Sequence, residues 1–208
     1  RRDSCGEGAE QVSERPILFN GTMVRAILSG DKTQTMRPLR KGIRYSVGDI
    51  LWVRETWQAI HVSIDPETGY GDDITAAPFI PRDHGDGHWA AVYAATDPAA
   101  QDHPDDRGFA WRPSIHMPRW ASRILLRVVE IECLDHARDI TETQAIAEGY
   151  QSAWIDRLKE AGADGPLGTP PKPVDWFCDL YAQIYGREAL DQPACAIRFV
   201  KHRTKEQK

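Results

Sequence analysis

The sequence predicts a mixed α+β fold in a single domain. Apolar segments typical of strands are interleaved with a few amphipathic helical segments, without the regular strand–helix–strand units of a parallel sheet. The chain has 208 residues, 41% hydrophobic and 27% charged, which is enough to bury a core. We expect one folded domain at residues 15–201, between a flexible arm at residues 1–14 and a basic tail at residues 202–208.

The domain is predicted to begin with a strand, a helix and a second strand. Residues 17–19 are apolar, and an amphipathic helix follows whose start can be capped by Asn20 or Thr22. Gly30 is expected to end this helix because glycine tolerates positive φ. Residues 33–35 are then β-prone.

The polar side chains after this helix permit two kinds of chemistry. A hydroxyl on Thr35 beside an amine on Lys32 is the minimum set for an activated oxygen nucleophile. Lys32 together with Arg37 equally suits a phosphate or a carbonyl oxygen. Lys32 and Thr35 would point to opposite faces of a regular strand, so they converge only if Lys32 belongs to the turn. A solvated turn followed by an edge strand is the alternative.

The middle of the chain is predicted to be loop-rich. Residues 50–53 form a strong apolar strand candidate, and Glu55 follows as a candidate acid, with an ion pair to its neighbour Arg54 as the alternative. Prolines and glycines are frequent across residues 58–122, where only residues 89–95 read as a strand. We therefore expect a loop-rich insertion that extends or covers a cleft.

One block of this insertion mixes flat aromatic rings with cations. The block contains Trp111, Arg112, His116, Arg119 and Trp120. Such a mixture suits stacking of a base and contact with a phosphate. The alternative is a proline-rich segment whose two tryptophans are buried in a core.

The C-terminal third is predicted to hold the longest strand, at residues 123–134, and three helices before a closing strand. The first helix, at residues 139–149, has the capping-box residues Thr141 and Gln144 and ends at Gly149. Glu148 therefore lies in its last turn, where a carboxylate opposes the helix dipole and costs stability. An acid in such a place is a hint of function. The later helices are expected at residues 152–161 and 174–185, and the closing strand at residues 194–200.

Composition restricts the classes of function. A net charge of −5 argues against electrostatic binding of nucleic acid over the whole surface, although a local basic cleft is compatible with it. The four cysteines are widely spaced and the seven histidines are not paired with them, so we expect reduced thiols, no metal and no other cofactor. No apolar run approaches the roughly 20 residues of a membrane span, and no signal peptide is visible, so we expect a cytoplasmic protein without a membrane partner.

Four blocks of the sequence resemble the ASCH domain family, a branch of the PUA-like superfamily. Gly30, Lys32 and Arg37 match its G-x-K-x-x-x-x-R motif, and residues 47–57, 111–123 and 139–149 are similar to phage and prophage ASCH proteins. Met36 stands where such proteins often carry a second arginine. The resemblance spans residues from about 16 to 200 and implies a small PUA-like β-barrel surrounded by helices.

The resemblance also implies an activity. Certain small bacterial ASCH proteins are metal-independent amidohydrolases that release the acetyl group from N4-acetylcytidine. By motif position their lysine, threonine and glutamate fall on Lys32, Thr35 and Glu148. Thr35 would attack the acyl carbonyl after activation by Lys32, while Glu148 would protonate the departing amine. Backbone N–H groups of the turn at residues 30–35 would stabilise the oxyanion.

Binding of RNA is the competing class, because PUA-like domains commonly bind RNA. Cations would then contact phosphates and tryptophans would stack bases, with Glu55 and His116 nearby; the candidates are Lys32, Arg37, Arg40, Arg112, Arg119, Trp52, Trp57, Trp111 and Trp120. Hydrolysis requires Lys32, Thr35 and Glu148 to converge. Binding instead requires an open basic groove, with Glu148 remote or paired elsewhere.

Overall fold

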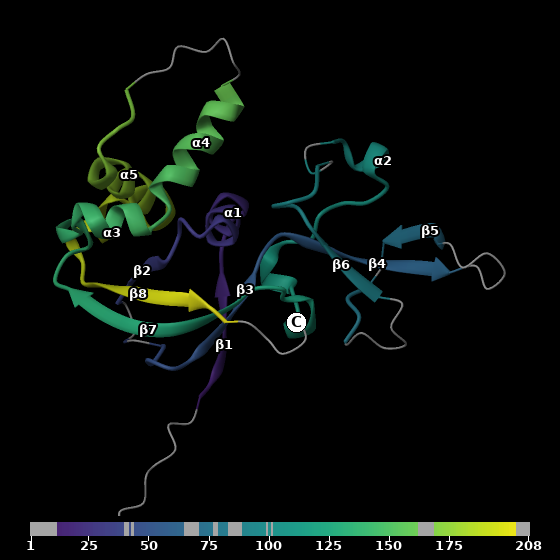
Figure 1. Cartoon of the computed structure of the whole chain (residues 1–208), viewed down its shortest axis with the longest axis horizontal. Helices are drawn as coiled ribbons and strands as arrows, with labels where there is room; N and C mark the ends of the chain where they lie inside the picture. Colours follow the sequence, from purple (N-terminus) through teal and green to yellow (C-terminus); the bar gives the residue numbers. More distant parts are fainter. Residues whose placement is uncertain are drawn as a thin grey trace, which may run out of the picture.

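The computed structural model describes residues 12–39, 42, 44–64, 71–76, 79–82, 89–98, 100, 102–161 and 169–202. Its strands form a five-stranded sheet in the order β1-β3-β7-β8-β2 and a three-stranded sheet in the order β5-β4-β6 (Figure 1). The strands of the first sheet are β1 (Glu14–Leu18), β2 (Gln34–Pro38), β3 (Ile50–Arg54), β7 (Leu125–Leu134) and β8 (Ala194–Lys201). Those of the second are β4 (Trp57–Ile64), β5 (Gly71–Ala76) and β6 (Trp89–Tyr93).

Helices are distributed over both parts of the structure. The α-helices are α1 (Gly21–Ser29), α2 (Pro104–Arg107), α3 (Glu142–Ala147), α4 (Tyr150–Ala161) and α5 (Pro173–Tyr185). Short 3-10 helices are η1 (Ser114–His116), η2 (Arg119–Ala121), η3 (Ala137–Asp139) and η4 (Arg187–Asp191). The prediction of a mixed α+β fold is confirmed. Within the described part of the chain, no helix has the length and hydropathy that a membrane crossing requires.

The five-stranded sheet is open in the described structure, so the closed barrel expected from the resemblance is not seen there. β1 pairs only with β3, in parallel, and β2 pairs only with β8, antiparallel, so these two strands are the edges. A side chain connects the edges instead of a backbone ladder, because Arg37 Nη2 on β2 donates to the Leu18 carbonyl on β1 at 2.8 Å.

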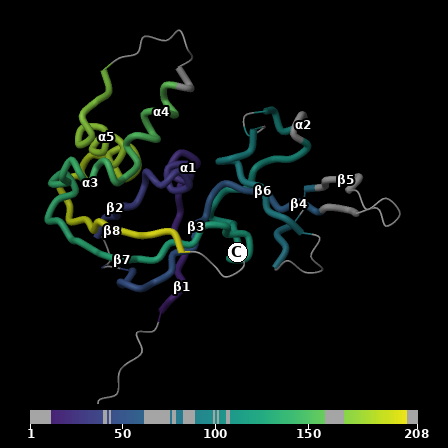
Figure 2. Tube along the Cα trace, viewed as in Figure 1, coloured from purple at the N-terminus to yellow at the C-terminus, as the bar shows by residue number. Residues whose placement is uncertain are grey.

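Two cores lie against this sheet. One is under α1 and contains Phe19, Val24, Leu51, Leu126 and Phe199 among its buried side chains. The other is under α3 and α5 and contains Met36, Phe177, Tyr181, Ala194 and Ala196 among its members. Strand β7 is buried mainly at its N-terminal end. α3, α4 and α5 lie on one side of α1 and the second sheet lies on the other (Figure 2).

The segment at residues 58–122 contains more strand than predicted. β4 and β5 are strands in addition to β6, and β4 pairs antiparallel with both neighbours. β5 begins Gly-Asp-Asp, and these residues are weak strand formers. Its strand structure depends on pairing with β4, which a local pattern does not reveal.

A third core, which we call the Trp57 cluster, holds this second sheet against the η1–η2 segment. Its fully buried members are Trp57, Ala59, Met117 and Ala121. Trp57 has no exposed surface and packs edge-on against Trp120, with ring centroids 5.8 Å apart. The indole N–H of Trp57 is buried without a hydrogen-bond partner among the described residues. Trp57 is therefore a packing residue here.

Replacing Trp57 should test this packing role. We expect Trp57→Ala to lower the free energy of unfolding by about 3–5 kcal/mol, because it leaves a large cavity. Trp57→Phe should cost less, since it keeps an aromatic ring and removes the unpaired N–H. Urea unfolding followed by circular dichroism gives both values. Ile115→Ala is the control, because that side chain is 58% exposed; equal losses in Trp57→Ala and Ile115→Ala would contradict the assignment.

Candidate functional site

The turn after α1 positions Lys32. α1 begins at an Asn20 cap, whose side chain accepts a hydrogen bond from Met23 N at 2.8 Å. It ends at Gly30, whose φ is 95°, as predicted. The backbone N–H groups of Gly30 and Lys32 both donate to the Ala26 carbonyl, at 3.1 and 3.0 Å. Lys32 therefore belongs to the turn, which is the condition for its convergence with residues of β2.

The end of α3 positions Glu148. Thr141 and Gln144 form the predicted capping box at the start of the helix, and Glu148 is its C-terminal cap. Lys32 and Glu148 face each other in an isolated antiparallel bridge, and Thr33 N donates to Ala147 O at 2.9 Å. Backbone hydrogen bonds thus hold the turn after α1 against the end of α3.

The side chains of Lys32 and Glu148 form a buried ion pair. Lys32 Nζ lies 2.6 Å from Glu148 Oε2 and 2.9 Å from the Glu148 carbonyl oxygen. The exposed fractions of the two side chains are 0% and 5%. Glu148 Oε1 is also buried, and none of the described residues donates a hydrogen bond to it. One carboxylate oxygen is therefore available to a group outside the pair.

Burial lowers the pKa of the Lys32 ammonium below its ordinary value. The Glu148 carboxylate and its hydrogen bond act in the opposite direction, and the positive charge of Arg37 adds to the lowering. Desolvation is the largest of these effects, so the direction we assign to the pKa of Lys32 is downward.

Gly149 allows the close approach of the two segments. Its φ is 96°, a conformation that residues with a side chain rarely adopt. A Cβ at this position would lie 3.0 Å from Ala26 Cβ and 3.2 Å from Lys32 Cβ. The absence of a side chain at Gly149 therefore lets the Lys32 stem and α1 pack against the start of α4.

Thr35 and Glu148 line the same small cavity, of about 20 Å³, together with Arg37 and Tyr181. A cavity of about 130 Å³ adjoins it between α1, α4 and α5, where Asn20, Met23, Glu148, Trp176 and Leu180 are among the lining residues. Met23, Glu148 and Leu180 line both spaces. Of the three predicted catalytic residues, Glu148 is thus in contact with Lys32 and lines the same cavity as Thr35.

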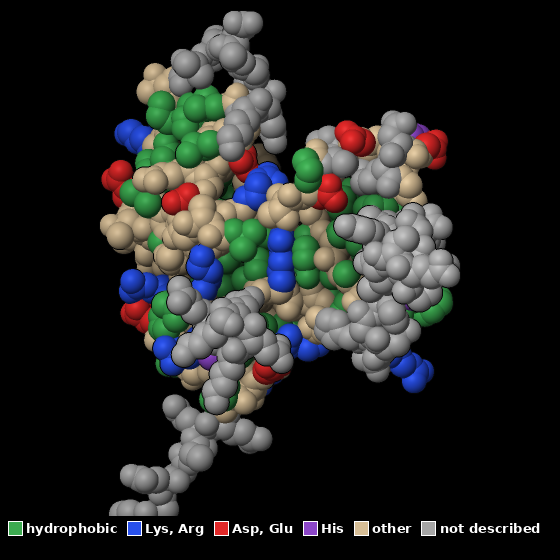
Figure 3. Space-filling view, turned by 45° about the vertical axis from the view of Figure 1, so that its right-hand side comes forward, with side chains coloured by type: hydrophobic (Ala, Val, Ile, Leu, Met, Phe, Trp, Pro, Cys, Tyr) green, Lys and Arg blue, Asp and Glu red, His purple; other side chains and the backbone are tan. Residues whose placement is uncertain are grey.

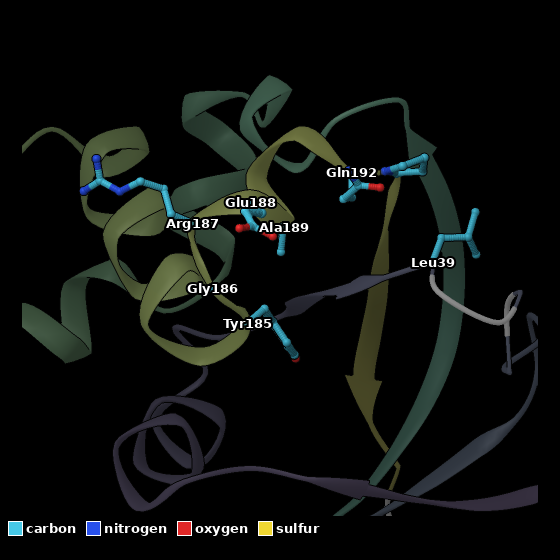
Figure 4. Close-up of a pocket in the computed structure, with 8 residues that line it drawn as sticks. Leu39, Tyr185, Gly186, Arg187, Glu188, Ala189 and Gln192 are labelled. Carbon is cyan, nitrogen blue, oxygen red and sulfur yellow. The ribbon is translucent and has the colours of Figure 1, made fainter.

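A larger cavity lies on the other side of Tyr185. Its volume is about 520 Å³, and Tyr185 lines both it and the small cavity. Figure 4 shows Leu39 on one side of this space and Glu188, Ala189 and Gln192 on the other, while the Arg187 side chain points away. Arg37 lies at the boundary, because its Nη1 donates to the Tyr185 hydroxyl at 2.7 Å and its guanidinium stacks 5.3 Å from the Phe19 ring centroid.

The structure does not bring the other predicted aromatic residues to this site. Trp57 and Trp120 pack on each other in the Trp57 cluster, and Trp120 Nε1 donates to Pro81 O. Trp111 Nε1 donates to Ala100 O, with its ring edge-on to Phe109. Trp52 is half-buried on β3 beneath the guanidinium of Arg54, 5.2 Å from its ring centroid.

The predicted polar binding residues are also placed elsewhere. Arg112 donates to Gln58 at 2.6 Å, Arg119 pairs with Glu14 at 2.7 Å, and His116 is exposed on η1. Arg40 lies outside the described residues. On the face shown in Figure 3, basic side chains are separated by hydrophobic, polar and acidic ones.

Glu55 has a different partner from the one that its sequence neighbour suggested. It is 1% exposed and both of its carboxylate oxygens accept from Arg123, each at 2.9 Å. Arg54 instead donates to the carbonyls of Ile115 and Met117. Burial raises the pKa of Glu55, and the Arg123 hydrogen bonds oppose that effect. The ion pair between Glu55 and Arg54 that the sequence offered as an alternative is wrong, because Arg123, just before β7, comes from a distant part of the chain and pairs with Glu55 instead.

Sequence reasoning missed several residues that form the site. The apolar stripe of the last helix predicts core positions for Trp176 and Leu180; Trp176 does pack on the core, and both residues also line the cavity beside Glu148. Tyr185 was not singled out, although it lies between two cavities. An apolar stripe is the same signal for a core and for a cavity wall, so helix periodicity could not separate them.

Comparisons with known proteins find structural likeness only. No family model and no curated protein matches the chain. The ASCH domain from Lactobacillus crispatus JV V101 aligns with a TM-score of 0.43 and 10% identity, covering 91% of this chain and 79% of that one. The protein EF3133 from Enterococcus faecalis V583, of family model DUF984, aligns with a TM-score of 0.38 and 9% identity, covering 93% and 85%. The chain is thus similar in structure to an ASCH domain at low identity, a likeness too weak to assign a role to any residue.

A double-mutant cycle should measure the coupling of Lys32 and Glu148. We expect Lys32→Met and Glu148→Leu each to cost about 3–5 kcal/mol of unfolding free energy, because each leaves a buried charge unpaired. The double variant should cost less than either single change, since it leaves no buried charge. Urea unfolding of the four proteins gives the coupling energy.

The pair Arg198–Glu130 is the matched control for this cycle. Its ionic distance is also 2.6 Å, but its side chains are 57% and 51% exposed. We expect a coupling of about 0–1 kcal/mol there, because solvent screens exposed pairs. Equal coupling energies in the two cycles would show that burial does not strengthen the coupling between Lys32 and Glu148.

Proposed function

We propose that the protein hydrolyses an amide bond, with Thr35 as nucleophile and Lys32 and Glu148 as the proton-transfer pair. The observation that carries this proposal is the buried ion pair of Lys32 and Glu148, because Glu148 has one carboxylate oxygen without a donor among the described residues and lines the same cavity as Thr35. The substrate we propose is an acylated pyrimidine nucleoside of the N4-acetylcytidine kind. That choice is based on the sequence resemblance at Gly30, Lys32 and Arg37.

The ion pair can supply both a base and an acid from one proton. In the ionic form, Lys32 is an ammonium and Glu148 a carboxylate. Transfer of that proton along the 2.6 Å hydrogen bond gives a neutral amine and a neutral carboxylic acid. Low polarity around the pair favours neutral forms over separated charges. The amine then accepts the Thr35 proton, and the acid protonates the leaving amine of the substrate. Glu148, now a carboxylate, accepts a proton from the water that attacks the acyl–Thr35 ester, and the Lys32 ammonium returns a proton to Thr35 as the carboxylic acid leaves.

The oxyanion of this reaction needs a positive group or an unused N–H donor. The amides of Gly30, Lys32 and Thr33 already donate to backbone carbonyls, so these three N–H groups of the turn at residues 30–35 are not available to an oxyanion. Arg37 lines the cavity beside Thr35 and carries the positive charge that a developing oxyanion requires. We therefore assign this role to Arg37 in the proposed reaction.

The substrate must enter through movement around α5. The space beside Thr35, about 20 Å³, is too small for a nucleoside, whereas about 520 Å³ beyond Tyr185 is within the usual range of small-molecule sites. We propose that the nucleoside occupies the larger cavity and that the acyl group passes Tyr185 to reach Thr35. The RNA-binding alternative has less support, because Lys32 is buried and Trp57 has no exposed surface.

Release of cytidine from N4-acetylcytidine, measured by liquid chromatography, tests the proposal. We expect turnover by the unaltered protein and a loss of about 10²–10⁴-fold in Glu148→Gln, the usual contribution of a general acid–base group. Thr35→Val, which removes the nucleophile and keeps the shape, should abolish turnover. Arg198→Ala is the control, because this exposed residue is outside the site. Circular dichroism confirms that each variant is folded; turnover that persists in folded Thr35→Val would refute the proposed nucleophile.

The pH dependence of turnover tests the shared proton. Only the form in which the pair carries one proton has both a base and an acid, so kcat/KM should be bell-shaped, with limbs that belong to the pair. The midpoint of the alkaline limb should lie below pH 10.5, the ordinary pKa of lysine, because burial lowers the pKa of Lys32. Glu148→Gln should lose the alkaline limb and rise with pH to a low plateau. A bell of unchanged shape in that variant would exclude Glu148 as the acid.

A further inference from the structure

Two of the cysteines lie opposite each other on neighbouring strands. Cys133 near the end of β7 is the register partner of Cys195 near the start of β8, and their Sγ atoms are 2.7 Å apart in a thiol–thiol contact. Cys133 is exposed and Cys195 is 3% exposed. Their positions are far apart in sequence, so their spacing gave no sign of this pair.

We propose that Cys133 and Cys195 form a reversible disulfide when the protein meets a disulfide oxidant such as oxidised glutathione. Directly opposed residues of an antiparallel pair have Cα atoms about 4.5–5.5 Å apart, and disulfides need about 4.4–6.8 Å. The two strands therefore already hold the cysteines at bonding separation. Rotation of side chains is sufficient, and the backbone does not have to move.

The order of the steps follows from exposure. The oxidant reaches Cys133, whose thiolate attacks one sulfur of the oxidant, forms a mixed disulfide and releases one thiol. Cys195 then attacks Cys133 Sγ and releases the second thiol. One S–S bond is broken and one is formed, and the two protons of the cysteines leave with the two released thiols or to solvent. Burial raises the pKa of Cys195 to about 12, with a further contribution from its hydrogen bond to Cys133, which agrees with Cys133 reacting first.

The bond would connect the strands that lead to the two halves of the candidate site. Cys195 is the register partner of Arg37 on β2, and the chain after Cys133 leads through η3 and α3 to Glu148. Closing the long loop from residue 133 to residue 195 restricts the unfolded chain and should stabilise the fold. The proposal does not depend on amide hydrolysis, because it concerns only the thiols and the sheet.

The test uses the whole chain in a Cys5→Ser background, because Cys5 lies outside the described residues. The folded protein is treated with oxidised glutathione, its remaining thiols are alkylated with iodoacetamide, and its peptides are mapped by mass spectrometry without reduction. We expect a peptide pair linked through Cys133 and Cys195. The thermal midpoint should rise by about 10 °C and return after dithiothreitol, which is the scale expected for closing a long loop.

Two variants make the result specific. Cys178→Ser should keep the linked peptide and the thermal shift, because Cys178 lies on α5 and is not one of the two opposed strand residues. Cys133→Ser should lose both. The proposal is overturned if both cysteines of the parent protein are alkylated after oxidation, if Cys133 stops at the glutathione adduct, or if the shift persists in Cys133→Ser.

Discussion

The contact between Lys32 and Glu148 determines how the early and late parts of the chain meet. The Lys32 ammonium donates both to the Glu148 carboxylate and to the Glu148 carbonyl oxygen. The backbone amide of the neighbouring Thr33 donates to Ala147 O. Removing two charges from water costs several kcal/mol per ion, so this contact is stable only with close geometry. Two further contacts join α1 and the turn after it to α4: Arg25 forms an ion pair with Asp156, and the Asp31 carboxylate accepts a hydrogen bond from the Ser152 hydroxyl. The site is therefore held at the junction of α1 with α3 and α4.

The ends of two helices explain why a lysine is tolerated there. Gly30 ends α1 and Gly149 follows α3, both with positive φ, and the Lys32 side chain lies between these turns. The last carbonyl groups of a helix lack partners within the helix and carry partial negative charge. The Glu148 carbonyl is such a group, and it accepts from Lys32 Nζ. The Glu148 carbonyl at the end of α3 and the buried Lys32 ammonium thus each supply the hydrogen-bond partner that the other needs.

Local signals predicted the parts of this site, and long-range contacts determined the rest. Gly30 and the Thr141–Gln144 box were readable because helix ends depend on a few adjacent residues. β5 was missed because its residues favour no strand without β4 beside them. The Glu55–Arg123 pair was missed because distant residues form it. The partnership of Lys32 and Glu148 was suggested by the resemblance and not by spacing, and the structure supplies its distance and burial.

The Lys32–Glu148 and Glu55–Arg123 ion pairs both bury a carboxylate, but they differ in a way that bears on function. In the Glu55–Arg123 pair, both carboxylate oxygens accept from one guanidinium, so the acid has no unused buried oxygen. In the Lys32–Glu148 pair, Oε1 has no donor among the described residues although it is buried. An unsatisfied buried oxygen costs about 1–3 kcal/mol, or more for a charged group. A ligand that donates to Oε1 would remove that cost, and Glu148 lines the cavity that Thr35 also lines. Glu148, unlike Glu55, is thus the carboxylate that keeps hydrogen-bonding capacity for a group that enters this cavity.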